Sequence, residues 1–479
     1  MKVAIIGAGP AGIAAGRELE RLGISNYVIF EKADSIGGTW RDNRYPGLTC
    51  DVPSHLYRFS FAPNPDWQYE YAPGEEIFDY IKNVAKEFIR EGEYRFNTEI
   101  TIAEYTNRKW RLQSPRGDEG VFDAVLAATG ILRHPVYPKI EGKETFFGDL
   151  FHASEWPQEY EVRGKRVGVV GTGSTAVQIF PAIIDEVATG KLFQRTPQWI
   201  FPAKNNPISE VKREKFRTSP EALSDLYSFL ALRFNGQFAA AVVGENEAAL
   251  KQTTQACIDN LNTVVDPILR KRLTPDYEVG CKRLVVSEKF YPAIQRTNAE
   301  LVDSGIVKIE SSGIRTNDGI LHELDTIVMA TGYDPFMFFK PMQVRGRDGL
   351  SLDDYWKDSH QAYRSVAIPD FPNFFLLGGP NSPVGNFSYI MTAEAQIGYV
   401  CQLLHLLKEG IYGEISPTHN ATERFNQEVR AAIPKTVWAR GGCTSWYHDK
   451  KGNVVAWPWT YERYQSDMAS PELMDFDLR

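Results

Sequence analysis

The sequence has few cysteines, and no two of them are closely spaced. There are five in the chain, namely Cys50, Cys257, Cys281, Cys401 and Cys443. Without a CxxC or CxxxxC pair, the sequence argues against a zinc ribbon and against the redox-active disulfide of a disulfide reductase. We therefore expect no metal site. An odd number of widely separated cysteines is typical of free thiols in a reducing compartment, so we expect all five to be unpaired.

The sequence also has no long hydrophobic run and no excess of positive charge. Its richest apolar stretch, 229–243, is interrupted by Arg233, Asn235 and Gln237 and is shorter than the ~18 apolar residues that a membrane helix needs. A strand-like run begins at Lys2, which leads us to expect no secretory leader. The net charge of −8 argues against a nucleic-acid partner and a polybasic membrane anchor. We expect a cytoplasmic protein that binds neither nucleic acid nor membranes.

Glycine, by contrast, is concentrated where apolar runs end. Four strand-like runs lie at 3–6, 123–127, 166–170 and 326–329. The first and third lead into glycine-rich loops, and the second and fourth lead into the tripeptide Ala-Thr-Gly. This repeated pattern predicts two nucleotide-binding sheets of parallel strands joined by helical crossovers. The order of the four signals predicts that the second sheet is inserted within the first.

The predicted fold class is therefore α/β, with two nested Rossmann-like dinucleotide-binding domains and a helical insertion. We assign residues 1–140 and 333–479 to the first domain and residues 141–204 and 280–332 to the second. Residues 205–279 are rich in alanine, leucine, glutamate and lysine, with apolar positions three and four residues apart. That spacing predicts helices, and because the segment has no glycine loop of its own, we interpret it as an insertion.

The first glycine loop has the context of a dinucleotide site. Its glycines are Gly7, Gly9 and Gly12, between an apolar strand and an alanine-rich helix whose first amides can meet a pyrophosphate. The next strand, 27–30, ends at Glu31, which lies 19 residues beyond Gly12. A carboxylate at this offset accepts hydrogen bonds from ribose hydroxyls. This pattern predicts an FAD site; the alternative is an ordinary tight turn between a strand and a helix.

The second loop repeats this layout with alanine at the third glycine position, in Gly171, Gly173, Ser174, Thr175 and Ala176. Here the next strand, 191–194, ends in Arg195, again 19 residues beyond the last loop position. A carboxylate would repel a 2′-phosphate, whereas a guanidinium binds one through charge-assisted hydrogen bonds. The second cofactor is thus predicted to be NADPH, with Thr196 as a further phosphate contact and Gln178 as a pyrophosphate contact. The alternatives are a solvated cation for Arg195 and an ordinary helix position for Gln178.

Two longer motifs resemble the fingerprints of one family. The pattern FxGxxxHxxxWP is matched by Phe146, Gly148, His152, Trp156 and Pro157. The pattern GGxWxxxxYPGxxxD is matched from Gly37 to Asp51, and it includes Gly38, Thr39 and Trp40. Both patterns, with a third match at Cys281-Lys282-Arg283, resemble those of the type I Baeyer–Villiger monooxygenases, a family of class B flavin-dependent monooxygenases. The resemblance covers most of the chain, except the helical insertion and the extreme C-terminus.

This resemblance implies a reaction. In that family, NADPH reduces FAD, the reduced flavin and O₂ form a C4a-peroxyflavin, and a ketone becomes an ester or lactone. It therefore implies a small-molecule ketone and O₂ as partners. The alternative within flavoenzymes is oxygenation of nitrogen or sulfur nucleophiles. An NADPH oxidase and a non-catalytic nucleotide-binding regulator are further alternatives. The sequence indicates neither which ketone reacts nor the oligomeric state.

The resemblance also implies roles for individual residues. Arg283 is expected to stabilise negative charge that develops on the reacting oxygens, and Asp51 is expected to orient it and offset its charge. Lys282 is expected to join Arg195 at the 2′-phosphate. The alternative without a catalytic role is that Lys282 and Arg283 are surface cations and Asp51 is an aspartate in a turn. The histidine His152, which lies between the two nucleotide sheets, is expected to couple the domains rather than to contact the carbonyl; a structural histidine is the alternative.

A tryptophan near the C-terminus completes the candidates. Trp446 resembles a family tryptophan on a loop that reaches NADP and the substrate pocket. The residues that follow it, 448–453, depart from the family pattern. A packing role for Trp446 is therefore the alternative to a cofactor contact.

Overall fold

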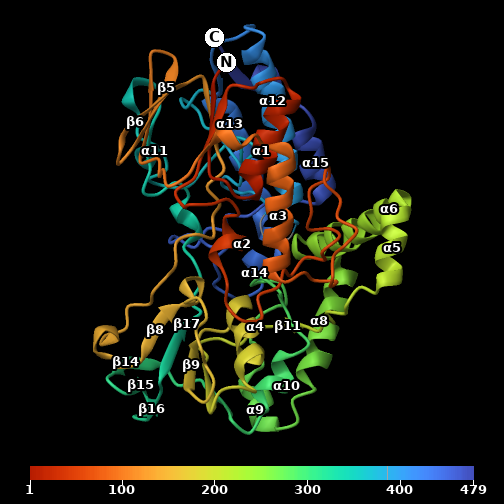
Figure 1. Ribbon diagram of the computed structural model, residues 1–479, viewed down its shortest axis with the longest axis vertical. Helices are drawn as coiled ribbons and strands as arrows, with labels where there is room; N and C mark the ends of the chain where they lie inside the picture. The colour runs from red at the N-terminus through yellow and green to blue at the C-terminus, as the bar shows by residue number, and fades with distance from the viewer. Residues whose placement is uncertain (384, 386) are drawn as a thin grey trace.

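The computed structural model of the protein describes residues 1–383, 385 and 387–479. Two sheets lie at opposite ends of the elongated molecule in Figure 1, and the green helical insertion runs along one side. The two chain ends lie close together beside the upper sheet. This arrangement follows from the chain order, because the chain leaves the first domain, builds the second and then returns.

The upper sheet is parallel and has the strand order β19-β7-β1-β2-β3. Every residue of β1 and β7 is buried, as expected for a parallel sheet that helices cover on both faces. The order brings the last strand, from late in the chain, beside β7. The strands are β1 (Val3–Ile6), β2 (Tyr27–Phe30), β3 (Tyr94–Arg95), β7 (Ala124–Ala127) and β19 (Phe374–Leu376). The helices that pack around this sheet include α1 (Pro10–Arg21), α3 (Gly74–Phe88) and α12 (Tyr389–Lys408).

The lower sheet is also parallel, in the order β13-β10-β9-β17-β8. All of its strands come between β7 and β19 in the chain, so the second sheet is nested within the first, as the order of the glycine signals predicts. The strands are β8 (Asp149–His152), β9 (Arg166–Val170), β10 (Thr189–Phe193), β13 (Ala299–Val302) and β17 (Thr326–Met329). The helices against it are α4 (Ser174–Ile183) and α10 (Phe290–Ile294).

Smaller sheets extend both halves of the molecule. The upper half has a sheet of β18 (Gln343–Arg345), β4 (Ile102–Thr106), β5 (Lys109–Ser114) and β6 (Gly117–Phe122). The lower half has a sheet of β14 (Ile306–Glu310), β15 (Gly313–Thr316) and β16 (Leu321–Glu323). Two short pairs join β11 (Ile200–Phe201) to β12 (Val285–Val286) and β20 (Ile415–Pro417) to β21 (Phe476–Leu478).

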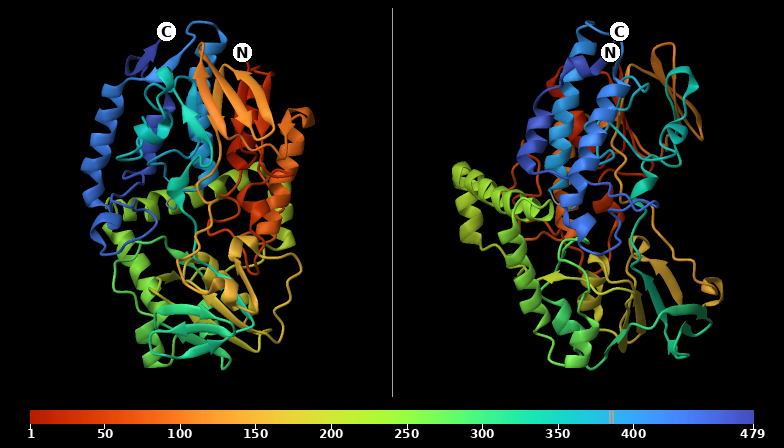
Figure 2. Two further views of the ribbon diagram at one scale, coloured as in Figure 1. Left: turned by 90° about the vertical axis from the view of Figure 1, so that its left-hand side faces the viewer. Right: turned by 180° about the vertical axis from the view of Figure 1, so that it is seen from behind.

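The insertion is helical, as its apolar spacing predicts. Side chains cap its helix starts: Ser209, Ser219, Asn246 and Asp266 each accept a hydrogen bond from a backbone amide of the first turn, which satisfies groups that the helix itself leaves unpaired. Figure 2 shows the helices projecting from the side of the molecule. They are α5 (Glu210–Thr218), α6 (Pro220–Ala231), the π-helix η4 (Leu232–Ala239), α7 (Ala240–Val242), α8 (Glu247–Leu261) and α9 (Pro267–Arg272).

The remaining helices are short or belong to the C-terminal part of the chain. The α-helices are α2 (Thr39–Asp42), α11 (Leu352–Tyr355), α13 (His419–Ala432), α14 (Val437–Arg440) and α15 (Tyr461–Ala469). The 3₁₀-helices are η1 (Glu91–Glu93), η2 (Lys143–Thr145), η3 (Ala153–Glu155), η5 (Pro335–Met337), η6 (Arg347–Gly349), η7 (Ile433–Lys435) and η8 (Leu473–Asp475). Among the residues that the structure describes, no helix has the length and apolar character needed to cross a membrane.

Candidate active site

The first glycine loop turns the chain from β1 into α1 with very little space. Gly7 has φ +111°, and a Cβ there would lie 2.4 Å from the carbonyl oxygen of Ala128, at the end of β7. A Cβ on Gly12 would lie 1.9 Å from the carbonyl oxygen of Gly7. Glycine is therefore required at both positions. Gly9 is the N-cap of α1, and no described side chain caps it. The first amides of the helix can therefore bind an anion.

Glu31 lies beside this loop, where β2 ends. Its Oε2 accepts a hydrogen bond from the amide of Ala8 at 3.0 Å, and its Oε1 accepts one from the amide of Ala33 at 2.9 Å. The guanidinium of Arg41 lies 3.4 Å from Oε1 and offsets the buried charge. Glu31 thus shapes the glycine loop itself, a role that the spacing alone did not indicate. A contact with the FAD ribose stays a prediction.

The second motif, from Gly37 to Asp51, packs against the same loop. Gly38, at φ +54°, approaches so closely that a Cβ on it would lie 3.2 Å from the Cα of Gly9. Thr39 begins α2, and the indole of Trp40 donates a hydrogen bond to the hydroxyl of Tyr57 at 3.1 Å. The motif therefore packs beside the glycine loop, and its part in binding FAD stays a prediction.

The second glycine loop repeats the geometry of the first. Gly171 has φ +122°, and a Cβ on it would lie 2.3 Å from the carbonyl oxygen of Ala330, at the end of β17. Gly173 is the N-cap of α4, and no side chain in the described ranges caps this helix. The helix begins with Ser174 and Thr175. In addition, the hydroxyl of Thr172 donates to the carbonyl oxygen of Thr196 at 2.6 Å. This bond holds the loop beside the segment that carries Arg195.

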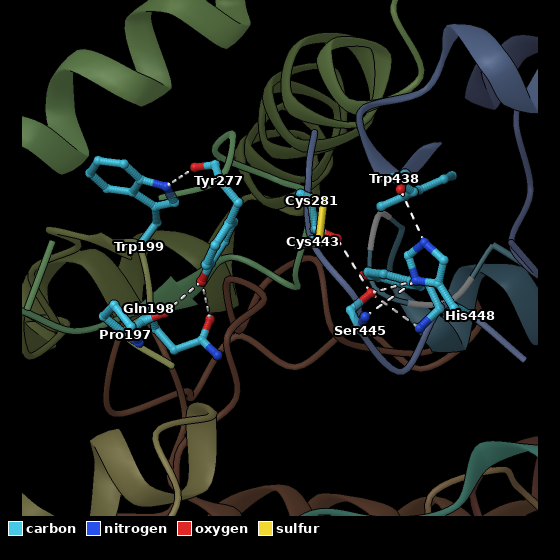
Figure 3. The surroundings of a disulfide bond; sticks show 10 residues. Pro197, Gln198, Trp199, Tyr277, Cys281, Trp438, Cys443, Ser445 and His448 are labelled. Atoms are coloured by element: carbon cyan, nitrogen blue, oxygen red, sulfur yellow. Dashed lines mark hydrogen bonds between the residues drawn. A yellow bond between two sulfur atoms is a disulfide. The ribbon is translucent and has the colours of Figure 1, made fainter. Parts of the chain in front are cut away.

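Arg195 and Lys282 lie close together although they are far apart in sequence. Tyr277 explains why: its hydroxyl donates to the carbonyl oxygen of Pro197 at 2.8 Å, and Trp199 Nε1 donates to the carbonyl oxygen of Tyr277 at 2.7 Å (Figure 3). Burial lowers the pKa of Lys282, and the nearby Arg195 lowers it further. Neither cation has a carboxylate within 4.0 Å among the described residues. Two mutually repelling cations form a site suited to a dianionic phosphate.

Arg283 and Asp51 form a bidentate pair. Arg283 Nε donates to Asp51 Oδ2 at 2.9 Å, and Nη2 donates to Oδ1 at 2.8 Å. Although burial alone lowers the pKa of Arg283, Asp51 raises it above its ordinary value. The guanidinium is therefore held charged and in one orientation. Both residues line a cavity of about 520 Å³.

This cavity lies between the nucleotide domains and the insertion. Its far wall is formed by η4 and α8, which contribute Phe234, Phe238 and Ala256 among others. No residue of this wall was proposed from the sequence as a functional residue. The only signal was the break that Arg233 and Gln237 make in an apolar stretch, and both residues turn out to line the cavity.

The expectation that all five cysteines are free is wrong for two of them. Cys281 and Cys443 form a disulfide with a Cα–Cα distance of 6.0 Å (Figure 3). They are 162 residues apart, so their spacing gave no sign of the pairing. The others, Cys50, Cys257 and Cys401, are free and buried.

The disulfide attaches the C-terminal segment directly beside Lys282 and Arg283. Ser445 Oγ donates to the carbonyl oxygen of Cys281 at 3.4 Å, and the His448 ring bonds to Ser445 and to the carbonyl oxygen of Trp438 (Figure 3). The backbone of this segment is also held, because the amide of Glu278 donates to the carbonyl oxygen of Gly441 at 2.9 Å. A segment from the middle of the sequence and one near the C-terminus therefore meet at the candidate site.

His152 connects two strand ends of the lower sheet. Its Nε2 donates to the carbonyl oxygen of Gly332 at 3.1 Å, and its Nδ1 accepts from the amide of Ser154 at 3.2 Å. Burial lowers the pKa of His152, so the ring is neutral. It does not line the large cavity. A role in coupling the domains stays a prediction.

The other fingerprint residues belong to the same edge of the lower sheet. A Cβ on Gly148 would lie 2.2 Å from the carbonyl oxygen of Asp325, which explains the glycine. Trp156 packs edge-on against Phe151, with ring centroids 5.3 Å apart, and Phe146 packs on the core beside β17. These residues are structural parts of the second domain and lie outside the cavity lining.

Gln178 and Trp446 have contacts of their own. The amide of Gln178 accepts from the Tyr45 hydroxyl at 3.0 Å and donates to the carbonyl oxygen of Thr49 at 3.0 Å. Gln178 thus joins α4 to the first domain, and its predicted pyrophosphate contact remains a prediction. Trp446 stacks on Tyr447, with ring centroids 4.4 Å apart, and lines a separate small cavity. No described cluster of three or more histidine, cysteine or acidic side chains is arranged to hold a metal ion.

The sequence is similar to monooxygenases along its whole length. Residues 4–220 match the family described as pyridine nucleotide-disulphide oxidoreductase. An uncharacterized monooxygenase of Mycobacterium tuberculosis is 43% identical over 478 residues, which cover 100% of this chain and 96% of that protein. A Baeyer–Villiger monooxygenase of Streptomyces coelicolor is 37% identical over 483 residues, covering 100% of this chain and 92% of the relative.

Solved structures agree over the same length. The OTEMO complex with FAD and NADP superposes with a TM-score of 0.89 at 26% identity, covering 100% of this chain and 99% of that one. Cyclohexanone monooxygenase from Rhodococcus sp. Phi1, bound to NADP⁺, superposes with a TM-score of 0.87 at 29% identity and the same coverage. These likenesses confirm the α/β fold class.

Proposed function

The chain belongs to the family of type I Baeyer–Villiger flavin monooxygenases, and from that premise we propose that it inserts one oxygen atom of O₂ next to a ketone carbonyl. The product is an ester or a lactone, and NADPH is the electron donor. The chain is an FAD- and NADP-dependent monooxygenase of this type, as its relatives and the FAD and NADP complex of a structural neighbour indicate. When bound, the flavin supplies electron transfer and oxygen activation.

The residues at both glycine loops fit these cofactors. The uncapped start of α1 provides backbone amides for the FAD pyrophosphate, and Glu31 lies at the end of the neighbouring strand. The uncapped start of α4 provides the same for NADPH, while Arg195 and Lys282 provide positive charge for its 2′-phosphate. In each case glycine is needed at the strand end because a Cβ there would collide with a carbonyl oxygen of the adjacent strand.

The observation that carries the proposal is the Arg283–Asp51 pair in the wall of the cavity. Attack on a ketone carbonyl places negative charge on its oxygen, and a charged group already fixed in position stabilises that charge without having to reorganise. Arg283 provides such a group. Asp51 holds the guanidinium plane in one orientation and offsets its charge while no substrate is present.

The second candidate is oxygenation of nitrogen or sulfur nucleophiles. That reaction generates no alkoxide, so it does not need a fixed cation at the position of the carbonyl oxygen. The Arg283–Asp51 pair therefore favours the ketone reaction. A plain NADPH oxidase would need neither this pair nor a substrate cavity of this size.

The test is product analysis by mass spectrometry with NADPH, FAD and a panel of cyclic, linear, aryl and steroid-sized ketones. We expect ester or lactone products from the native protein. Arg283→Ala should lower ketone oxygenation at least about 100-fold with FAD still bound. Arg111→Ala, which removes another bidentate arginine–aspartate pair on the sheet of β4, β5 and β6, is the matched control and should act like the native protein.

Two results would overturn the proposal. One is a near-normal rate of ketone oxygenation by Arg283→Ala. The other is a native protein that oxygenates amines or sulfides but no ketone of the panel, or that converts all consumed NADPH into hydrogen peroxide.

A further inference from the structure

The large cavity is apolar along its walls and charged at its opening. Apolar side chains from η4, α8 and the segment after Arg283 form the walls, including Phe234, Ala256 and Leu284. Its lining also includes two exposed cations, Lys204 and Arg233. Lys204 and Arg233 are exposed, whereas 29% of the Arg283 side chain is exposed, so solvent reaches the cavity beside the two exposed cations, and this side is called the opening.

Neither exposed cation forms an ion pair within the described residues. Within the described ranges, no carboxylate lies within 4.0 Å of Arg233 or Lys204. The guanidinium of Arg233 lies 5.8 Å from the ring centroid of Phe229, a contact that leaves its hydrogen-bond donors free. The third charged group at the opening is Glu70, whose Oε2 accepts a hydrogen bond from Asn206 at 3.0 Å. The opening therefore carries one net positive charge.

Arg233 and the Arg283–Asp51 pair face the same stretch of the cavity. Tyr71 lines this cavity together with them. Burial raises the pKa of Tyr71, with Glu70 raising it and Arg233 lowering it, and Asp51 contributes a smaller upward shift. Because Arg283 and Arg233 line the same cavity, a ligand that fills it can contact both.

We propose that the substrate is a ketone that carries a carboxylate, with the ketone carbonyl at Arg283 and the carboxylate at Arg233 and Lys204. The inference rests on the proposed ketone oxygenation. One net positive charge at the opening matches the single negative charge of a carboxylate better than the −1.5 to −2 of a phosphate monoester. The apolar walls require an apolar chain or ring between the two groups. A neutral ketone would leave the two cations without a partner.

The π-helix η4 contributes the main recognition residue. Arg233, Phe234, Gln237 and Phe238 all come from this one helix and all line the cavity. Segments of π-helix often occur at functional sites. Here the segment presents a cation, an amide and two aromatic rings to the same cavity, so it determines both the apolar and the charged part of the specificity.

The test uses straight-chain methyl-ketone carboxylates of graded length and their methyl esters. The two members of each pair share the ketone and the chain and differ in charge. We expect the native protein to favour the acid over its ester in kcat/KM by about 10-fold or more. Arg233→Gln should raise the KM for the acid about 10-fold, and much more than the KM for the ester. Lys204→Gln should do the same to a smaller extent, and Arg233→Lys should recover part of the loss.

The matched control is Lys212→Gln, which removes an exposed cation from α5 outside the cavity lining. It should leave both substrates unaffected. Equal kcat/KM for acid and ester in the native protein would overturn the inference, as would an Arg233→Gln variant that weakens both substrates equally. If either result is found and neutral ketones are still oxygenated, the proposed function stands and only the carboxylate preference fails.

A second measurement distinguishes a failure of the proposed ketone oxygenation from a failure of the proposed carboxylate site. If no ketone is oxygenated at all, the proposed function fails, and the carboxylate site is judged by binding. The bound flavin's absorbance is then titrated with the ketone acids. Weaker binding to Arg233→Gln than to the native protein supports the site, and equal binding overturns it.

Discussion

Arg283 is bound to Asp51 by two parallel hydrogen bonds that join residues 232 positions apart in the sequence. The pair brings together the end of the glycine-rich motif near the N-terminus and the segment that leaves the helical insertion. Its geometry is the fork-to-fork arrangement that fixes a guanidinium plane. Because the two residues come from distant segments of the chain, the packing of those segments determines how the cation is placed at the cavity.

Replacing Asp51 should therefore weaken the ability of Arg283 to stabilise negative charge on the reacting oxygens. Asp51→Asn keeps the size of the side chain but removes the charge that offsets the guanidinium. We expect product formation to fall about 10- to 100-fold, while NADPH oxidation continues and yields hydrogen peroxide. Parallel assays of ester product, NADPH and peroxide measure this. A variant that still couples NADPH oxidation to ester formation at the native ratio would contradict the role of the pair.

Arg195 should determine the choice between NADPH and NADH. It is exposed at the end of β10 beside Lys282, and the structure places no carboxylate of the described chain against it. Arg195→Ala should raise the KM for NADPH about 10-fold or more and change the KM for NADH little, because NADH has no 2′-phosphate. Stopped-flow reduction of the flavin by each nucleotide separates the two effects. Equal losses with both nucleotides would remove Arg195 from the phosphate site.

The disulfide should be measurable and stabilising. Without reductant, the denatured protein should show three free thiols, those of Cys50, Cys257 and Cys401, and after reduction it should show all five. Closing a loop of 162 residues restricts the unfolded chain, so Cys443→Ser should lower the thermal midpoint by about 5 °C.

Reductant provides the control for this prediction. It should lower the midpoint of the native protein toward that of Cys443→Ser and should not change the variant. Five titratable thiols in the denatured, unreduced protein would show that the bond does not form.

The carboxyl of Glu394 should make stability depend on pH. Burial raises its pKa to about 7, although Ser60 donates two hydrogen bonds to it. Between the ordinary value of 4.5 and about 7, the folded protein binds a proton that the unfolded chain does not. The contribution of Glu394 to stability is therefore present below that interval and is lost as the pH rises through it. Glu394→Gln should flatten the change in thermal midpoint between about pH 5 and about pH 8. An unchanged slope would contradict the raised pKa.

Local features of the chain were predictable from the sequence. The runs 3–6, 166–170 and 326–329 form the predicted strands with the predicted bounds. Both glycine loops occur where a strand turns into a helix, since a side chain at Gly7 or Gly171 would collide with a carbonyl oxygen of the adjacent strand. The fold class followed from these signals and the family from the longer motifs at 37–51 and 146–157, because each signal depends on residues that are close together in sequence.

The site was predictable only in part. Arg283 and Asp51 were identified through the resemblance, and the structure places them in contact. Gln178 was predicted to contact a pyrophosphate, which stays a prediction, and the sequence did not indicate that its amide joins α4 to the loop that carries Tyr45 and Thr49. The wall that η4 contributes was not predicted, since amphipathic spacing shows that a segment is helical but not which surface it faces.

The sequence by itself determined the two nested sheets with their glycine loops, because backbone conformation depends on neighbouring residues; the assignment of FAD to the first sheet and NADPH to the second stays a prediction. Only the tertiary structure decided that Cys281 bonds to Cys443 and that Arg233 lies at the opening of the Arg283 cavity. Contacts between residues from distant segments depend on how those segments pack together. No spacing within a single segment encodes that packing.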